Sequence, residues 1–278
     1  MTLSKEMLEY VATLVEKSLG IQYSKENHYQ LEKRMNEVAA AFGMRDAEEL
    51  FHTLRERTNQ KAINALLDAS TNNETSFFRD HAVFDAFAND LLNNPEFNGN
   101  KQNYIRIWSA ASSTGQEAYS LAILLRQWQL QKPNRNYEIV VTDFSDRVLQ
   151  QAKEGKYSDL EVQRGLTPEF LNKHFEKTTA DPKYWMVRPE LKRQMSFRKV
   201  NLLEDWSDIG SFDVVFCRNV LIYQNMENKK KIISRLVNTI LPEGYLVLGA
   251  AETLIGLSEK FEIRRLGKAV YYQKLPKG

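Results

Sequence analysis

The fold follows from the stretch Tyr104-Ile-Arg-Ile-Trp-Ser-Ala-Ala-Ser-Ser-Thr-Gly-Gln-Glu-Ala-Tyr-Ser-Leu-Ala-Ile-Leu-Leu125. It predicts a short apolar strand, a turn built of small residues from 109 to 115, and an amphipathic helix. In an open parallel α/β sheet, such a turn lies at the carboxyl end of a strand, where small residues let a ligand approach the backbone and the N-terminus of the next helix faces it. The stretch therefore predicts a site for a nucleotide-like ligand.

The turn differs from a dinucleotide-binding fingerprint, because Ala111 and Ser113 stand where glycines would be expected. Glu117 falls in the first turn of the helix, where the helix dipole favours a carboxylate but the carboxylate would repel a pyrophosphate. Two interpretations stay open at this point. Glu117 either marks a ligand without phosphate or is simply a favourable first-turn residue.

Length and composition set outer limits on the kind of protein. A chain of 278 residues predicts two domains, and 38 Lys and Arg against 36 Asp and Glu give no global positive field for a nucleic acid. Cys217 is the only cysteine and the four histidines are dispersed, so we expect no disulfide framework and no metal site. Neither a signal segment nor an apolar run of about 20 residues is found, which predicts a cytoplasmic protein without membrane insertion.

The first quarter of the chain, residues 4–70, predicts a series of helices because apolar residues recur at helical spacing. A polar run that contains Asn73, Thr75 and Arg79 then leads into two aromatic residues. It is either a helix entry with Phe77 and Phe78 as core anchors or part of a site between the domains. Both interpretations are open from composition alone.

The remaining chain continues the α/β pattern. The strand 137–144 ends in Asp143, which is placed to accept hydrogen bonds from two ribose hydroxyls, in preference to only capping the helix that follows. Residues 156–199 lack the βα rhythm, and 184–188 and 195–200 predict short antiparallel strands of a small insertion. The sheet resumes from 196, and the buried strand from 212 makes Cys217 a packed core thiol. Another strand at 245–249 and a closing hairpin complete the chain.

The candidate site residues collect where these strands end. They are the turn 109–117, Asp143, Asn201, and Arg218 with Tyr223 nearby. Carboxyl ends of parallel strands share one edge of a sheet, so these residues are expected to lie together. A pocket with two carboxylates, small residues and no phosphate cradle suits S-adenosylmethionine better than NAD.

Five segments resemble, in this order, the signatures of the bacterial chemotaxis receptor glutamate methyltransferases: Asn73-Glu-Thr-Ser-Phe-Phe-Arg79, Ser109-Ala-Ala-Ser-Ser-Thr-Gly-Gln-Glu-Ala-Tyr-Ser120, Val141-Thr-Asp143, Val200-Asn-Leu202 and Phe216-Cys-Arg-Asn-Val-Leu-Ile-Tyr223. The resemblance extends over almost the whole chain. Five ordered motifs are far more specific than a single turn.

The resemblance implies a Rossmann-like α/β methyltransferase domain with a small antiparallel β-subdomain insertion, preceded by an all-α N-terminal domain. The expected bounds are 1–70 for the helical domain, 71–99 for a linker and connecting helix, and 100–278 for the methyltransferase domain, with the insertion at about 178–199. The implied reaction transfers a methyl group from S-adenosyl-L-methionine to glutamate side-chain carboxylates of chemoreceptors. Its products are glutamyl methyl esters and S-adenosyl-L-homocysteine.

Where the motifs match, the resemblance implies which residues of this chain bind the cofactor: Asn73, Thr75, Arg79, Glu117, Asp143, Asn201, Leu202, Arg218 and Asn219. Arg79 and Tyr223 would lie nearest the reacting groups and are the candidate catalytic residues. A glutamate carboxylate is already ionised at neutral pH, so attack on the methyl group needs no strong base and positioning must dominate. We expect Arg79 to orient the substrate carboxylate and Tyr223 to donate its hydroxyl to it.

Some residues depart from the family pattern. Ala111 and Ser112 replace a common glycine and cysteine, 116–118 replaces a common Glu-Glu-Pro, and Asp143-Phe-Ser replaces Asp-Ile-Asp. Small size is kept in the turn, so cofactor binding is still expected. The segment 178–185 is poor in glycine, which predicts binding to the cytoplasmic domain of chemoreceptors without tethering to a C-terminal pentapeptide.

The sequence also offers a candidate surface for the partner and alternative functions. Lys33 and Arg34 lie on a predicted N-terminal helix, where a charged outer face is the default explanation. The alternative is that this basic helix faces an acidic receptor helix bundle. We expect a monomer. The alternatives are a methyltransferase for another protein or a small acid, and a non-catalytic signalling protein that binds the cofactor.

Overall fold

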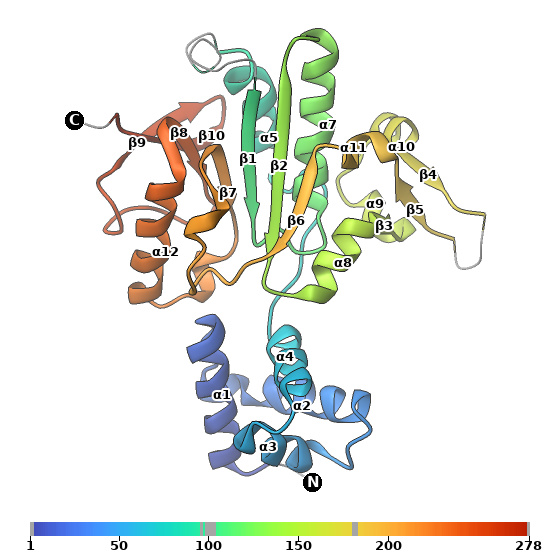
Figure 1. Cartoon of the computed structure of the whole chain (residues 1–278), viewed down its shortest axis with the longest axis vertical. Helices are drawn as coiled ribbons and strands as arrows, with labels where there is room; N and C mark the ends of the chain where they lie inside the picture. Colours follow the sequence, from blue (N-terminus) through green and yellow to red (C-terminus); the bar gives the residue numbers. More distant parts are fainter. Residues whose placement is uncertain (1–2, 95–96, 98–103, 180–182, 277–278) are drawn as a thin grey trace. The chain divides into compact units, whose positions relative to one another are not determined.

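The computed structural model describes residues 3–94, 97, 104–179 and 183–276 (Figure 1). The chain forms two compact units, each considered by itself. The first contains the described residues up to Asn72 together with 201–205 and 223–231, and the second contains the rest. Across the described residues, no helix combines the length and the apolar character that crossing a membrane requires.

The first unit is helical, as predicted for residues 4–70. Its helices are α1 (Lys5–Leu19), α2 (His28–Ala41), α3 (Ala47–Glu56) and α4 (Gln60–Ala69), with a 3-10 turn η1 (Lys25–Asn27) before α2. Ser4, Asp46 and Asn59 begin α1, α3 and α4 as N-caps, because each side chain accepts a backbone N–H of the first turn. The apolar side of each helix is buried, which confirms the helical N-terminal region.

The second unit is built on a seven-stranded sheet in the order β6-β2-β1-β7-β8-β10-β9. The strands are β1 (Tyr104–Ala110), β2 (Asn136–Asp143), β6 (Met195–Lys199), β7 (Phe212–Cys217), β8 (Ile240–Val247), β9 (Phe261–Leu266) and β10 (Ala269–Lys274). The first five of that order pair in parallel, and β10 runs antiparallel to both its neighbours. The predicted α/β fold with a closing hairpin is confirmed.

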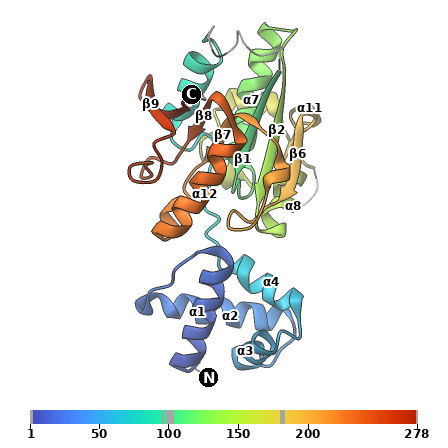
Figure 2. The ribbon, with the colours of Figure 1, turned by 60° about the vertical axis from the view of Figure 1, so that its left-hand side comes forward.

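The order of strands reverses at β1. The chain moves from β1 to β2 through α7 (Gln116–Gln131), and later from β7 to β8 through α12 (Met226–Thr239), in the opposite direction. Right-handed crossovers therefore place α7 and α12 on opposite faces of the sheet, as Figure 2 shows. The carboxyl ends of β1 and β7 form a topological switch point, which is where ligands bind in open α/β sheets.

The sheet is buried on both faces. On one face Ile105 and Ile107 pack with residues of α7, of α5 (His81–Ala86) and of the π-helical turn η2 (Phe87–Leu91). On the other face Trp108 packs edge-on against Trp206, with ring centroids 5.0 Å apart. Cys217 lies fully inside this core, and burial raises the pKa of its thiol well above the usual value. The prediction of a packed core thiol is therefore confirmed.

A small antiparallel sheet, β3-β5-β4, is inserted between β2 and β6. Its strands are β3 (Lys156–Tyr157), β4 (Phe175–Lys177) and β5 (Trp185–Val187), and its helices are α9 (Asp159–Gln163), α10 (Pro168–His174) and α11 (Pro189–Lys192). Helix α8 (Asp146–Glu154) precedes it. Strands β3 and β4 lie before the expected 178–199, and β5 lies within it.

One of two strand predictions for this segment was wrong. Residues 195–200 were expected as an antiparallel strand of the insertion, and the main sheet was expected to resume from 196. Met195–Lys199 pairs in parallel with β2 at the edge of the main sheet, which confirms the second expectation and not the first. The edge strand leaves much of its side-chain surface exposed, so its alternating polar pattern is the same as that of a strand in a small subdomain. The pattern alone does not give the partner strand.

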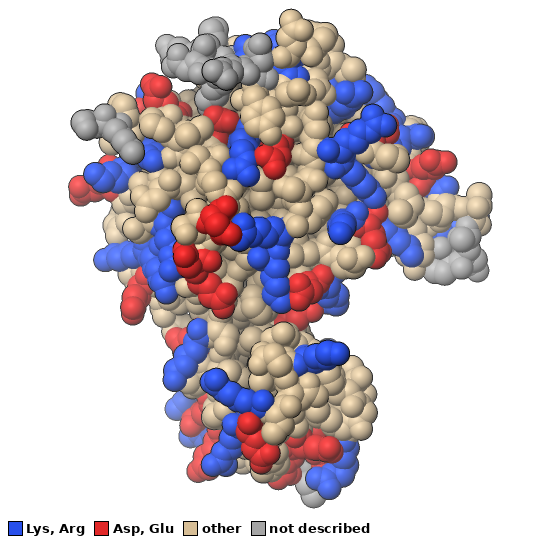
Figure 3. Space-filling model, viewed as in Figure 1, with Lys and Arg blue, Asp and Glu red and all other residues tan. Residues whose placement is uncertain are grey.

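Charged side chains of both signs are interspersed on the face drawn in Figure 3. This agrees with the near balance of 38 basic and 36 acidic residues in the sequence. In the described part of the chain, no cluster of three or more His, Cys, Asp or Glu residues is arranged to hold a metal ion.

Candidate functional site

Three segments that the sequence singles out meet at the carboxyl edge of the main sheet. Ala110, the last residue of β1, lies opposite Thr142 of β2 and Cys217 of β7. The turn after β1, Asp143 at the end of β2, and Arg218 after β7 therefore share one edge. Their predicted proximity is what the strand register produces.

The turn after β1 is held in a strained conformation. Ala111 and Ser113 have φ angles of 52° and 53°, in the left-handed region that favours glycine. A left-handed non-glycine residue costs roughly 1–2 kcal/mol, so the turn keeps the backbone path of a glycine turn without its glycines. Gly115 also has a positive φ, 94°, and a Cβ there would in addition lie 2.8 Å from the Cβ of Ala152 on α8.

Asp143 is almost fully buried, with 6% of its surface exposed. Its Oδ2 accepts the backbone N–H of Ser113 at 2.9 Å, and its Oδ1 accepts that of Ser145 at 3.0 Å. The N-cap of α8 is Ser145, whose hydroxyl accepts the N–H of Val148, so Asp143 is not the cap. Its carboxylate is instead fixed by the turn after β1.

Ser113 also connects this turn to the polar run before α5. Its hydroxyl donates to the carbonyl oxygen of Asn73 at 2.8 Å, while its backbone N–H is bound by Asp143. One residue therefore joins Asn73, the small-residue turn and the end of β2. Thr75 lies in the same run and is half-buried.

Arg218 is the most enclosed charge of the site, with 2% of its side chain exposed. Its guanidinium donates to Glu117 Oε2 at 3.1 Å, to Asp80 Oδ2 at 2.6 Å and to the carbonyl oxygen of Arg79 at 2.8 Å. Glu117, 12% exposed, also accepts from the hydroxyl of Ser109 at 2.7 Å. Glu117 is thus part of a buried network, which a solvated first-turn acid would not be.

Arg79 lies between two left-handed residues, Phe78 at φ 49° and Asp80 at φ 61°. Its Nη1 donates to the carbonyl oxygen of Glu74 at 3.0 Å. The carboxylates of Glu74 and Asp80 pair instead with Arg164 and Arg218. Among the residues that the structure describes, no carboxylate lies within ion-pair distance of Arg79.

The polar run is anchored by its aromatic residues. Phe77 and Phe78 are both buried, which confirms that they are core anchors. The backbone N–H of Phe78 is bound by the hydroxyl of Ser120 on α7 at 2.9 Å. A Cβ at Gly165 would lie 1.8 Å from the carbonyl oxygen of Phe77, so only glycine fits against this backbone.

The remaining candidates belong to the first unit. Asn201 donates to the carbonyl oxygen of Ser18 at 2.8 Å and accepts the N–H of Leu203 at 3.0 Å, and Leu202 is buried. The hydroxyl of Tyr223 accepts from Nδ2 of Asn72 at 2.9 Å. The structure therefore groups the candidates in two sets: Asn73, Thr75, Arg79, Glu117, Asp143, Arg218 and Asn219 in the second unit, and Asn201, Leu202 and Tyr223 in the first.

Glu252, which sequence reasoning missed, fixes the loop that follows Arg218. Its carboxylate accepts four backbone N–H groups, from Asn219 at 2.8 Å, Val220 at 2.9 Å, Ile222 at 3.2 Å and Gly249 at 2.7 Å. Asn219 is left-handed, with φ 59°. A single acid in a loop after a strand carries no signal of this role, because three of its four partners are backbone groups about 30 residues earlier.

Replacing Glu252 by glutamine should lower the free energy of unfolding by about 2 kcal/mol, because hydrogen bonds to a charged acceptor are lost and the new NH₂ group faces backbone donors. Urea denaturation measures the change. Exposed Glu259 in the same loop region is the matched control, and Glu259→Gln should be near neutral. Equal stability of the two variants would show that the carboxylate does not hold the loop.

A family model and the sequences of known proteins indicate the same family. Residues 73–270 match the model of the CheR methyltransferase, SAM binding domain. Chemotaxis protein methyltransferase Cher2 of Pseudomonas putida is 35% identical over 269 residues, covering 95% of this chain and 96% of that protein. A chemotaxis protein methyltransferase of Vibrio parahaemolyticus is 36% identical over 274 residues, covering 98% of each. The N-methyltransferase NodS of Bradyrhizobium japonicum, solved with S-adenosyl-L-homocysteine, aligns with a TM-score of 0.38 and 16% identity over 61% of this chain and 78% of that one.

Proposed function

The chain belongs to the CheR methyltransferases, and we propose that it transfers a methyl group from S-adenosyl-L-methionine to glutamate side-chain carboxylates of chemoreceptors. The products would be glutamyl methyl esters and S-adenosyl-L-homocysteine. Membership makes the chain a methyltransferase that uses S-adenosylmethionine, while the glutamate acceptor and the receptor are the proposal. The observation that supports it most is the meeting of Asp143 and the Glu117–Arg218 pair at the switch point of the sheet.

The residues at this edge fit the cofactor. Asp143 offers a buried carboxylate, fixed by two backbone N–H groups, as an acceptor for ribose hydroxyls. The turn after β1 consists of small residues, and the network of Glu117 and Asp80 with the single Arg218 carries a net negative charge, which suits a cationic ligand better than a pyrophosphate. When bound, S-adenosylmethionine supplies a methyl group on a positively charged sulfur.

The proposed cofactor-binding residues act in two ways. Most of them are proposed to line the cofactor site directly: Asn73, Thr75, Arg79, Glu117, Asp143, Asn201, Leu202 and Asn219. Arg218 is proposed to act indirectly. Because its guanidinium is engaged by Glu117, Asp80 and the Arg79 carbonyl, it positions Glu117 and the polar run.

Arg79 and Tyr223 are proposed to position the acceptor glutamate. The substrate carboxylate is ionised at neutral pH, so what the protein must supply is alignment of its oxygen with the methyl carbon. Arg79 has no acidic partner among the described residues and can orient the substrate carboxylate. The hydroxyl oxygen of Tyr223 accepts from Asn72, which leaves its proton to donate to the substrate.

Replacing Arg79 by alanine should lower turnover at saturating cofactor and receptor by about 100-fold, because a misaligned carboxylate attacks poorly. Initial rates of methyl transfer measure this. The control is Arg164→Ala, which removes the exposed ion-pair partner of Glu74, a residue of the same polar run as Arg79. Its turnover should lie within a few-fold of that of the unmodified chain. Near-normal turnover of the Arg79 variant would exclude the orienting role.

The acceptor is tested with a purified cytoplasmic receptor fragment. Tandem mass spectrometry after incubation with S-adenosylmethionine should place the methyl group on glutamate side chains, and Glu→Gln substitutions at those positions should abolish it. Methylation of another residue type, or none at all, would overturn the proposal.

We further propose that the chain acts as a monomer on the cytoplasmic domain of the receptor without pentapeptide tethering. The segment 178–185 that motivates the second point includes residues 180–182, which lie outside the described residues. Calorimetry with a receptor C-terminal pentapeptide should detect no tight binding. Tight binding would contradict pentapeptide-independent recognition.

A further inference from the structure

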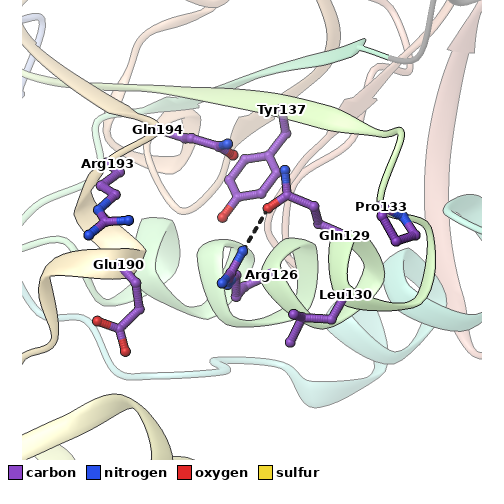
Figure 4. A pocket seen from close by; sticks show the side chains of 8 residues that line it. All are labelled: Arg126, Gln129, Leu130, Pro133, Tyr137, Glu190, Arg193 and Gln194. Atoms are coloured by element: carbon purple, nitrogen blue, oxygen red, sulfur yellow. Dashed lines mark hydrogen bonds between the residues drawn. The ribbon is translucent and has the colours of Figure 1, made fainter.

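A pocket lies away from the carboxyl edge of the sheet, between the end of α7, the start of β2 and α11. It has a volume of about 350 Å³, within the range of small-ligand sites. Figure 4 shows its lining: Arg126, Gln129, Leu130, Pro133, Tyr137, Glu190, Arg193 and Gln194. The methyl-transfer proposal uses none of these residues.

The pocket presents two guanidinium groups that form no ion pair with an acid of the described residues. Arg126 donates to the side-chain oxygen of Gln129 at 3.0 Å, and neither Arg126 nor Arg193 has a carboxylate within ion-pair distance in the described part of the chain. With one lining carboxylate, Glu190, the pocket is positive by one charge. Unpaired guanidinium groups that line one pocket are suited to carboxylate or phosphate oxygens.

Tyr137 adds a buried donor. Only 3% of its surface is exposed, and the structure gives its hydroxyl no hydrogen-bond partner among the described residues. In Figure 4 this hydroxyl points toward the Arg126 and Gln129 side chains. Burial raises the pKa of Tyr137 to about 12, so it stays protonated and able to donate at neutral pH. The side-chain oxygen of Gln194 is likewise buried without a partner.

We propose that this pocket binds a small anion that bears a carboxylate or phosphate group, held by the guanidinium groups of Arg126 and Arg193 and by the hydroxyl of Tyr137. Glu190 and the Gln194 oxygen are acceptors at the same pocket, so a ligand that also carries a hydroxyl or amino donor fits better than a bare anion. The carbonyl end of α7 weakly opposes an anion, and the two arginines outweigh it.

The pocket is separate from the methyl-transfer site. Residue 137 stands at its wall and residue 143 at the other end of the same strand, about 20 Å away. Helix α7 likewise carries Glu117 in its first turn and the pocket residues in its last turns. The proposal is therefore independent of the reaction assigned to the carboxyl edge.

The test follows the side-chain amide NMR signals of Gln129 and Gln194 in the full chain. Inorganic phosphate and succinate are titrated separately at constant ionic strength. Saturable shifts with either probe are expected, and the probe that saturates first identifies the preferred group. Arg126→Gln and Arg193→Gln should each weaken binding at least tenfold, and Tyr137→Phe, which removes only the hydroxyl, about tenfold.

Lys153→Gln is the matched control, because it removes one positive charge from an exposed position on α8. Its binding curve should match that of the unmodified chain. Shifts that fail to saturate with both probes would overturn the proposal, as would equal weakening by Lys153→Gln. Tyr137→Phe keeps the ring in the core, so it separates lost binding from lost folding.

Discussion

Replacing Arg218 by methionine is expected to lower the free energy of unfolding by about 3 kcal/mol. The side chain is 2% exposed, and its loss leaves the Glu117 carboxylate, 12% exposed, without its cationic partner. A buried charge without a partner is far more costly than the pair itself is stabilising. Urea denaturation of the full chain measures the change.

A second substitution distinguishes this explanation from simple loss of packing. Adding Glu117→Gln to Arg218→Met removes the stranded charge and should recover part of the lost stability. Arg164→Met, which breaks the exposed pair with Glu74, should cost about 1 kcal/mol or less. If the double variant is no more stable than Arg218→Met alone, the buried charge is not the cause.

Replacing Asp143 by alanine is expected to weaken binding of S-adenosyl-L-homocysteine by at least about 100-fold. Hydrogen bonds to a charged acceptor contribute about 1.5–3 kcal/mol each, and two ribose hydroxyls would lose that acceptor. The substitution also releases the N–H groups of Ser113 and Ser145, which loosens the turn after β1. Isothermal titration calorimetry gives the affinity directly.

Asp146 provides the control for this measurement. It lies three residues away in the first turn of α8, is 74% exposed and pairs with Lys199 on the surface. Asp146→Ala should bind S-adenosyl-L-homocysteine as the unmodified chain does. An unchanged affinity of a folded Asp143→Ala variant would remove Asp143 from the cofactor site.

Local patterns were enough to predict the frame of the site. The apolar run, small-residue turn and helix from 104 to 125 form from neighbouring residues, so the sequence predicts them without knowledge of the rest of the fold. Asp143 was predictable for the same reason, because it ends a strongly apolar strand. The family resemblance added Arg79 and Tyr223, which composition alone leaves undecided.

Contacts between residues far apart in the chain could not be predicted from the sequence. Arg218 and Glu117 are 101 residues apart, and no local pattern links a strand-end arginine to a first-turn acid on another helix. Glu252 binds backbone groups, which every residue carries, so its partners leave no mark in the sequence. The edge strand Met195–Lys199 was assigned both to the insertion and to the main sheet, because its pairing with β2 depends on the tertiary fold.

The most direct test of the central claim is transfer of a labelled methyl group from S-adenosylmethionine to chemoreceptor-containing membranes, followed by mild base. The unmodified chain should label the receptor band, base should release the label as expected for a glutamyl methyl ester, and Asp143→Ala should abolish labelling at low cofactor concentration. Label that resists base, or a receptor that stays unlabelled while another protein is methylated, would contradict the account.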